Sequence, residues 1–138
     1  MPELSTNIYV IDASVVFSIL STYEEDTSKN FKNMLRVTSN IFLCPSLITY
    51  EIGNNLKNAV KDRRILQAEV QKLIKMFKNL PLKLLDVNLS VTLHIALYYK
   101  LTYYDASYLY LCIKNKAQLL SLDKELLQAF NSYKNSPS

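Results

Sequence analysis

Glycine is almost absent from this chain of 138 residues, which contains only Gly53. Gly53 lies inside a helical pattern and not in a turn between a strand and a helix. The two common phosphate-binding loops, GxGxxG and GxxxxGK[ST], need glycines where the backbone approaches a phosphate. The sequence therefore excludes a Rossmann dinucleotide and a P-loop nucleotide, and we expect no nucleotide cofactor.

Histidine and cysteine are also scarce, with one histidine and two cysteines. His94 lies in the helical stretch SVTLHIALYY, where we expect a partly buried side chain, and the GxSxG motif of a serine hydrolase is absent. Cys44 and Cys112 each sit in an apolar stretch without CxxC or Cys/His spacing. This pattern predicts reduced core thiols of an intracellular protein and no zinc site.

Long apolar runs are missing as well. No window approaches the roughly 18 uninterrupted apolar residues of a membrane span, and the N-terminal MPELSTNIYV does not have the form of a signal peptide. We therefore expect a cytoplasmic protein that does not associate with membranes. The formal net charge of +4 suits a polyanionic partner but is too small to identify one.

The chain does contain short β-branched or aliphatic runs that alternate with longer helical patterns. The predicted strands are 8–11, 41–44, 82–85 and 118–122, and the predicted helices are 14–20, 26–38, 46–61, 66–78, 90–100, 105–116 and 124–133. Strands separated by helices need crossover connections, which produce a parallel sheet covered on both faces. We expect an α/β three-layer sandwich with a central parallel sheet of four strands.

Length and composition predict one domain. The chain is 49% hydrophobic, which is enough for a single compact domain with its own core. We place this domain at residues 1–133 and expect the polar residues 134–138 to form a disordered tail.

Four acidic residues follow the predicted strands or open the predicted helices. Asp12 ends the first strand inside the apolar run YVIDASVVF, and Asp123 follows the last strand. Asp105 opens the helix DASYLYLCIKNK, and Glu51 lies on the inward side of the helix after FLCPS, in its second turn. Ligands of open parallel sheets bind at the carboxyl ends of the strands. These four side chains could therefore converge at one edge of the sheet.

Each of these acids also has a purely structural explanation. Asp12, Asp105 and Asp123 all occupy places where aspartate caps a helix N-terminus. Glu51 could equally be a salt-bridged structural residue. Asp12 most needs an explanation, because a buried carboxylate is costly unless something pairs with it.

The order of four short motifs is more specific than any single motif. These are VIDASVV with Asp12 and Ser14, PSLITYEIGNNL with Glu51, LTYYDASYLYLC with Asp105, and LLSLDKEL with Ser121 and Asp123. In this order they resemble the PIN-domain nucleases over nearly the whole chain, particularly the small single-domain proteins that include VapC-type toxins. Family members commonly have a fifth strand after the last helix, so the sheet would have four strands, or five.

The resemblance implies a metal-dependent endoribonuclease that hydrolyses RNA phosphodiester bonds with Mg²⁺ or Mn²⁺. It makes Asp12, Asp105, Asp123 and Glu51 the catalytic and metal-binding residues. Ser14 and Ser121 would contact these acids and not the metal itself. The chemistry agrees, since two carboxylates about 4 Å apart repel each other by roughly 4 kcal/mol at an effective dielectric constant near 20. A hard divalent cation relieves that repulsion. Glu125 is either a further acid of the site or ordinary charge in the first turn of a helix.

The substrate implied by the resemblance is RNA. The stretch NNLKNAVKDRR places Lys57, Lys61 and Arg64 on neighbouring turns of the helix that carries Glu51, where they would contact the RNA backbone or form a solvated face. The tyrosine pairs at 98–99 and 103–104 would be core or dimer contacts, or would stack on unpaired bases.

The resemblance also implies protein partners. Proteins of this type commonly form homodimers, and we expect residues 93–111 and the following helix to supply the self-association surface. If the chain is the toxin of a toxin–antitoxin pair, its second partner is an antitoxin protein.

Two other interpretations remain. The chain could be a noncatalytic PIN-like module that binds nucleic acid or protein, although such a module does not need four carboxylates that repel one another. A receiver-like regulatory domain has the same alternation of strands and helices, with Asp86 after the third strand as its phosphoacceptor, but it needs a fifth strand.

Overall fold

The sheet at the centre of the molecule has four parallel strands in the order β3-β2-β1-β4. We analysed a computed structural model that describes residues 4, 7–21 and 26–136. The strands are β1 (Ile8–Ile11), β2 (Ile41–Pro45), β3 (Leu82–Leu85) and β4 (Gln118–Leu120). The predicted parallel sheet is confirmed with four strands, and the described residues contain no fifth. Strand β1 is internal, between β2 and β4.

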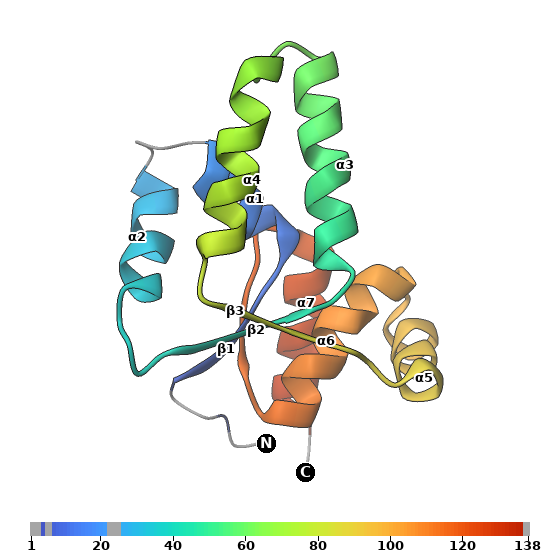
Figure 1. Ribbon diagram of the computed structural model, residues 1–138. Helices are drawn as coiled ribbons and strands as arrows, with labels where there is room; N and C mark the ends of the chain where they lie inside the picture. The colour runs from blue at the N-terminus through green and yellow to red at the C-terminus, as the bar shows by residue number, and fades with distance from the viewer. Residues whose placement is uncertain (1–3, 5–6, 22–25, 137–138) are drawn as a thin grey trace.

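Helices connect and cover the strands. They are α1 (Ala13–Ser21), α2 (Asp26–Leu35), α3 (Ile48–Lys61), the short 3-10 helix η1 (Gln67–Glu69), α4 (Val70–Asn79), α5 (Leu89–Tyr99), α6 (Tyr103–Asn115) and α7 (Lys124–Lys134). Helices α3 and α4 stand side by side as an antiparallel pair that rises from one end of the molecule, whereas α5, α6 and α7 gather at the other (Figure 1).

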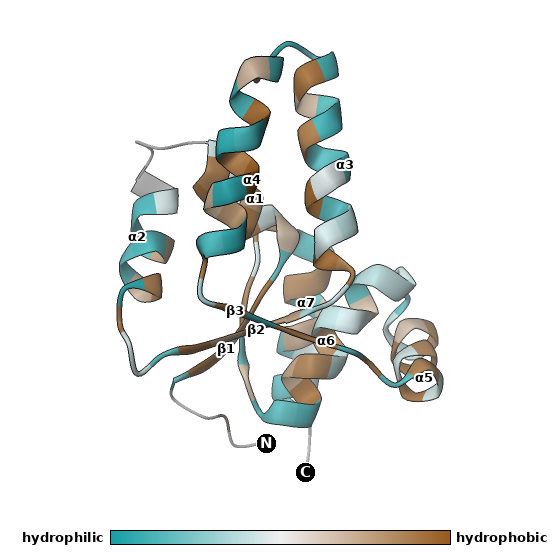
Figure 2. Ribbon diagram, in the orientation of Figure 1, coloured by the Kyte–Doolittle hydropathy of each residue, from teal (hydrophilic) through white to brown (hydrophobic). Residues whose placement is uncertain are grey.

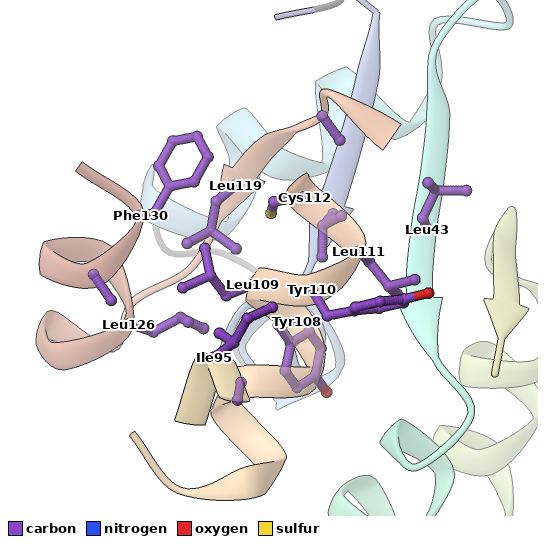
Figure 3. Close-up of a cluster of buried hydrophobic side chains, with 14 of the residues drawn as sticks. Leu43, Ile95, Tyr108, Leu109, Tyr110, Leu111, Cys112, Leu119, Leu126 and Phe130 are labelled. Carbon is purple, nitrogen blue, oxygen red and sulfur yellow. The ribbon is translucent and has the colours of Figure 1, made fainter. Parts of the chain in front are cut away.

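Alternate side chains of the strands supply two separate cores. Val10, Leu43 and Leu119 belong to the core formed with α5, α6 and α7, part of which is drawn in Figure 3. The neighbouring strand residues Ile11, Phe42 and Cys44 belong to the core formed with α1, α3 and α4. Successive strand side chains point to opposite faces, so this alternation gives a sheet covered on both sides. The arrangement is the predicted three-layer α/β sandwich.

Helix α6 is the most deeply buried helix. Its residues 106–112 are all buried, and it packs against β1 and β2. In Figure 3 this helix runs through the middle of the labelled cluster, with Tyr108 and Tyr110 on it. This packing holds the first turn of α6, which carries Asp105, in a fixed place beside the sheet.

Both cysteines are free thiols in the core, as expected. The Cys44 thiol donates a hydrogen bond to the carbonyl oxygen of Ile11 at 3.3 Å, and burial raises the pKa of both thiols. The prediction for His94 was wrong, because its side chain is exposed on the outer side of α5.

Helix α7 is the last element of the described chain. Helix α7 ends at Lys134, and the Ser136 hydroxyl donates a hydrogen bond to the Tyr133 carbonyl at 2.6 Å. Of the predicted tail, residues 137 and 138 lie outside the described residues. No helix within the described ranges is long and apolar enough to cross a membrane.

Candidate active site

The candidate active site begins where β1 and β4 end side by side. Asp12 follows β1 and Ser121 follows β4. The backbone N–H of Asp12 donates to the Leu120 carbonyl at 3.1 Å, which extends the parallel ladder one residue beyond β1. This pairing brings Asp12 and Ser121 together although 109 residues separate them in the sequence.

The Asp12 carboxylate is only 5% exposed and accepts three hydrogen bonds. The Ser14 hydroxyl donates to Oδ1 at 2.6 Å, the Val15 N–H donates to Oδ1 at 3.2 Å, and the Ser121 hydroxyl donates to Oδ2 at 2.5 Å. The bond from Val15 makes Asp12 the N-cap of α1. A carboxylate offers about four acceptor positions, so one position on Oδ2 remains open for another ligand.

The two serines also tie the loop between β4 and α7 to Asp12. Ser14 Oγ accepts the N–H of Leu122 at 3.0 Å, and Ser121 Oγ accepts the N–H of Asp123 at 2.9 Å. Because each serine oxygen accepts an N–H, its own proton is directed to the carboxylate. Ser14 and Ser121 therefore hold the Asp12 carboxylate in one orientation.

Asp123 begins α7 beside these serines. Its Oδ1 accepts the N–H of Leu126 at 3.1 Å, so Asp123 is the N-cap of the helix, and its side chain is half-buried. Burial is the main reason that the pKa values of Asp12 and Asp105 are raised, and the charge of Asp123 raises both further. Asp123 therefore caps α7 and also lies near the other acids.

Asp105 is not a cap, which corrects one of the structural explanations. Helix α6 begins at Tyr103, and Thr102 caps it by accepting the Asp105 N–H at 3.1 Å. The Asp105 carboxylate is therefore left for another purpose. Its partial burial, followed by the charges of Asp123 and Asp12, raises its pKa to about 6.

Glu51 reaches the cluster from α3. The helix begins at Ile48, so Glu51 lies in its first turn and not in the second as predicted. Its Oε1 accepts a hydrogen bond of 2.6 Å from the Tyr108 hydroxyl, and Tyr108 is only 1% exposed. Burial, and then the charges of Asp105 and Asp12, raise the pKa of Glu51, whereas the bond from Tyr108 acts in the opposite direction.

Tyr108 contacts the candidate site but was not predicted to do so from the sequence. It lies three residues after Asp105, and such residues share one face of a helix. A polar group one turn beyond a site acid is a signal that could have been followed. Its partner is 57 residues away on α3, however, and only the packing of the helices reveals that contact.

The cluster has no positive charge of its own to balance it. Among the described residues, every charge that shifts the pKa of Asp12, Glu51 or Asp105 comes from another acid, and the exposed Glu125 adds to the effect on Asp105. No three carboxylates in the described part of the chain already stand as a metal-binding group. The donor set nevertheless fits Mg²⁺ or Mn²⁺, since it consists of hard oxygen ligands with unbalanced negative charge.

The basic residues lie farther away, and one is not where it was predicted. Helix α3 ends at Lys61 and the backbone reverses at Arg63, with a φ of 58°, so Arg64 lies beyond the helix. Its guanidinium is 3.6 Å from the Asp62 carboxylate. Lys57 and Lys61 are exposed on α3, about 9 and 15 Å along the helix axis from Glu51 at a rise of 1.5 Å per residue.

Comparisons with known proteins agree with this geometry. The chain matches the PIN domain family over residues 9–130. Among solved structures it is similar to the protein PAE2754 from Pyrobaculum aerophilum, with 25% sequence identity, a TM-score of 0.71, and coverage of 88% of this chain and 78% of that one. No curated protein matches it. PIN domains are generally nucleases that use divalent metals. Since the match covers almost the whole sheet and all four acids, the chain belongs to the PIN domain family.

Proposed function

We propose that this protein is a metal-dependent endoribonuclease in which Asp12, Glu51, Asp105 and Asp123 hold Mg²⁺ or Mn²⁺. The observation that carries the proposal is the buried Asp12 carboxylate, which keeps one acceptor position open. Among the described residues, the one charge that shifts its pKa is that of another acid, Asp123. Such a buried carboxylate is costly in the protein alone and becomes favourable with a cation.

The roles of the residues follow from their hydrogen bonds. Asp12, held by Ser14 and Ser121, would present Oδ2 as a principal ligand together with Asp105. Asp123 would be a further ligand, and Glu51 a ligand or the group that orients the attacking water. The bound cation would supply an activated water and offset charge on the phosphate. His94 is exposed on α5 and is outside this cluster, so the acids would do the work of a general base.

A noncatalytic PIN-like module that binds nucleic acid or protein is the second candidate. It is favoured by one observation, that the described carboxylates do not already form a group able to hold a metal. The two candidates differ in what a cation does. A nuclease needs the cation for cleavage, whereas a binding module does not need it at all.

The test is cleavage of single-stranded and structured RNA by the purified protein with Mg²⁺, with Mn²⁺ and with EDTA. We expect cleavage with either metal, none with EDTA, and none from Asp12→Asn. Asp86→Asn is the matched control, because Asp86 is an exposed acid that follows β3 as Asp12 follows β1. Metal-independent behaviour, or equal activity of the two variants, would favour the binding module. Single-stranded DNA of the same sequence tests the choice of RNA.

We further propose that a second copy of this chain is one partner, through α5. This helix has no Asp, Glu, Lys or Arg, so its outer face fits an equally uncharged surface, such as its own counterpart. Leu89, Leu93, Leu97 and Tyr98 are exposed there. Helix α5 appears brown along much of its length in Figure 2, unlike the mixed colours of α3 and α4. Residues 106–111 of the predicted surface are buried in the protein's own core, so they are not available to a partner.

The antitoxin hypothesis has its support on another surface. A groove of about 780 Å³ lies between α3 and α4, and its lining includes Ile52, Leu56, Ile74, Phe77, Lys57 and Lys78. Apolar side chains with lysines among them suit an amphipathic segment that carries acidic residues. The test is growth arrest on expression of this chain, its absence for Asp12→Asn, and relief by the product of a neighbouring gene. Unarrested growth would contradict the toxin role without touching the ribonuclease proposal.

A further inference from the structure

A pocket beside Glu51 has no role in the chemistry described so far. It has a volume of about 480 Å³ and lies between the first turns of α3 and the start of α6. Its lining residues are Leu47, Tyr50, Glu51, Asn54, Asn55 and Tyr104. Small-molecule pockets range over about 300–1,000 Å³, so one nucleotide-sized group can be accommodated.

Two exposed tyrosines border this pocket. Tyr50 is 82% exposed and Tyr104 is 62% exposed, so neither ring contributes to a core. Each is the residue immediately before a candidate metal ligand, Glu51 in one case and Asp105 in the other. Successive residues of a helix point about 100° apart. The acids therefore turn inward while the adjacent rings stand at the mouth of the pocket.

The remaining lining offers hydrogen bonds. Asn54 and Asn55 each carry an amide that can both donate and accept, and they follow Tyr50 and Glu51 by one turn on α3. Nucleobases present donors and acceptors along their edges and an aromatic face above and below. Proteins recognise unpaired RNA by stacking bases on aromatic side chains and bonding those edges.

We propose that this pocket binds one unpaired nucleobase of the RNA strand, with Tyr50 and Tyr104 as stacking surfaces and the Asn54 and Asn55 amides at the base edge. The inference rests on the proposed ribonuclease function, since the pocket adjoins the acids that would act on the phosphate. Half of its lining is polar or charged, whereas α5 and the α3–α4 groove offer the apolar surfaces that a protein partner needs. Bases in a duplex are already stacked and could not enter, so the pocket predicts a single-stranded substrate.

The experiment measures the binding of a labelled single-stranded RNA hexamer to Asp12→Asn protein, which would not cleave it, by fluorescence anisotropy. Tyr50→Leu and Tyr104→Leu should each weaken binding roughly tenfold, which is the usual scale of one stacked base. Tyr50→Phe should retain the affinity, because the aromatic face remains. Leu66→Ala is the control, since Leu66 is 69% exposed but lies between α3 and α4, outside this pocket. Binding of an RNA duplex should change in none of these variants.

Several outcomes would overturn the proposal that this pocket binds a nucleobase. These are an absence of hexamer binding, unchanged affinity in both leucine variants, equal losses in Tyr50→Phe and Tyr50→Leu, or an equal loss in the Leu66→Ala control. A change in Tyr50→Leu that is confined to the oligomeric state, measured by light scattering, would assign the surface to a second copy of the chain. A failure of the proposed ribonuclease function would be distinguishable from these outcomes. RNA bound in the pocket but never cleaved by the wild type with Mg²⁺ or Mn²⁺ would overturn the nuclease and keep the base site.

Discussion

Asp12 is buried where a leucine would be usual, and Leu97 is exposed where an aspartate would be usual. The aspartate is 5% exposed and the leucine is 71% exposed. The acid cluster and α5 thus depart from the ordinary distribution of residues in opposite directions. Asp12 is held by three hydrogen bonds from its own chain. The outer leucines of α5 have no comparable cover from the described residues. The difference teaches what the two proposals require, since a small cation would be enough to complete the first region, whereas the second would need a whole apolar surface.

The largest expected effect comes from removing the charge of Asp12. Asp12→Asn should lower RNA cleavage at least about a hundredfold, because the cation, the activated water and the charge offset are lost together. Its melting temperature should stay level or rise without metal, since the substitution relieves repulsion and asparagine caps α1 equally well. Initial cleavage rates and thermal unfolding by circular dichroism measure the two effects. A variant as active as the wild type would leave capping as the whole explanation of Asp12.

The next largest effect tests the other side of the comparison. Leu93→Asp and Leu97→Asp should each convert a dimer to monomer at micromolar concentration, because a charge would be buried in an apolar contact. Light scattering after size exclusion gives the mass. Leu66→Asp is the control, since Leu66 is equally exposed but lies between α3 and α4. A wild type that is monomeric at high micromolar concentration would contradict the assignment of α5.

A smaller effect is expected at Tyr108. Tyr108→Phe keeps the buried ring but removes the hydroxyl that holds Glu51, and hydrogen bonds to charged groups contribute about 1.5–3 kcal/mol. The affinity for Mn²⁺, measured by calorimetry, should fall roughly tenfold. The same substitution in a Glu51→Gln background should change the affinity little, because Tyr108 acts through Glu51. Tyr110→Phe, at a second buried tyrosine of α6, is the control. Equal losses in both backgrounds would mean that Tyr108 acts through packing alone.

The smallest effect is a dependence of stability on pH. The pKa of Asp105 is raised from 3.8 to about 6, so between these values the folded protein binds a proton more tightly than the unfolded chain. The free energy of unfolding of the metal-free protein should therefore fall as the pH rises from 4 to 6. Asp105→Asn should make this fall shallower, and Mn²⁺ at pH 7 should restore stability to the wild type. Urea unfolding in EDTA at several pH values provides the measurement. If the free energy of unfolding fell equally with pH in the wild type and in Asp105→Asn, the dependence would not come from Asp105.

Much of the fold could be predicted because each strand and helix carries its own local pattern. The apolar runs at Ile8–Ile11 and Leu82–Leu85 give strands with the predicted bounds. The errors fall at helix ends, where a cap decides the outcome. With Thr102 as its cap, α6 starts at Tyr103, two residues before the predicted start at Asp105. The backbone reversal at Arg63 places Arg64 outside α3.

The site was less accessible to sequence analysis. Aspartates at the ends of strands are expected at one edge of a parallel sheet, but a cap and a ligand look alike in sequence. The structure explains why, since Asp123 uses one oxygen to cap α7 and keeps the other. The bond between Glu51 and Tyr108 depends on how α3 packs relative to α6. No local pattern encodes that relationship.

The bonds from Ser14 and Ser121 to Asp12 have a consequence for the making of the protein. Asp12 is translated before β4 and Ser121, which follow it by more than a hundred residues. Until then β1 lacks one neighbouring strand, and its carboxylate has neither Ser121 nor the loop that carries Asp123. Under the proposed function, the cutting centre would therefore stay incomplete while the segment that carries β4 and Ser121 is still being made, because Asp12 depends on a contact 109 residues away.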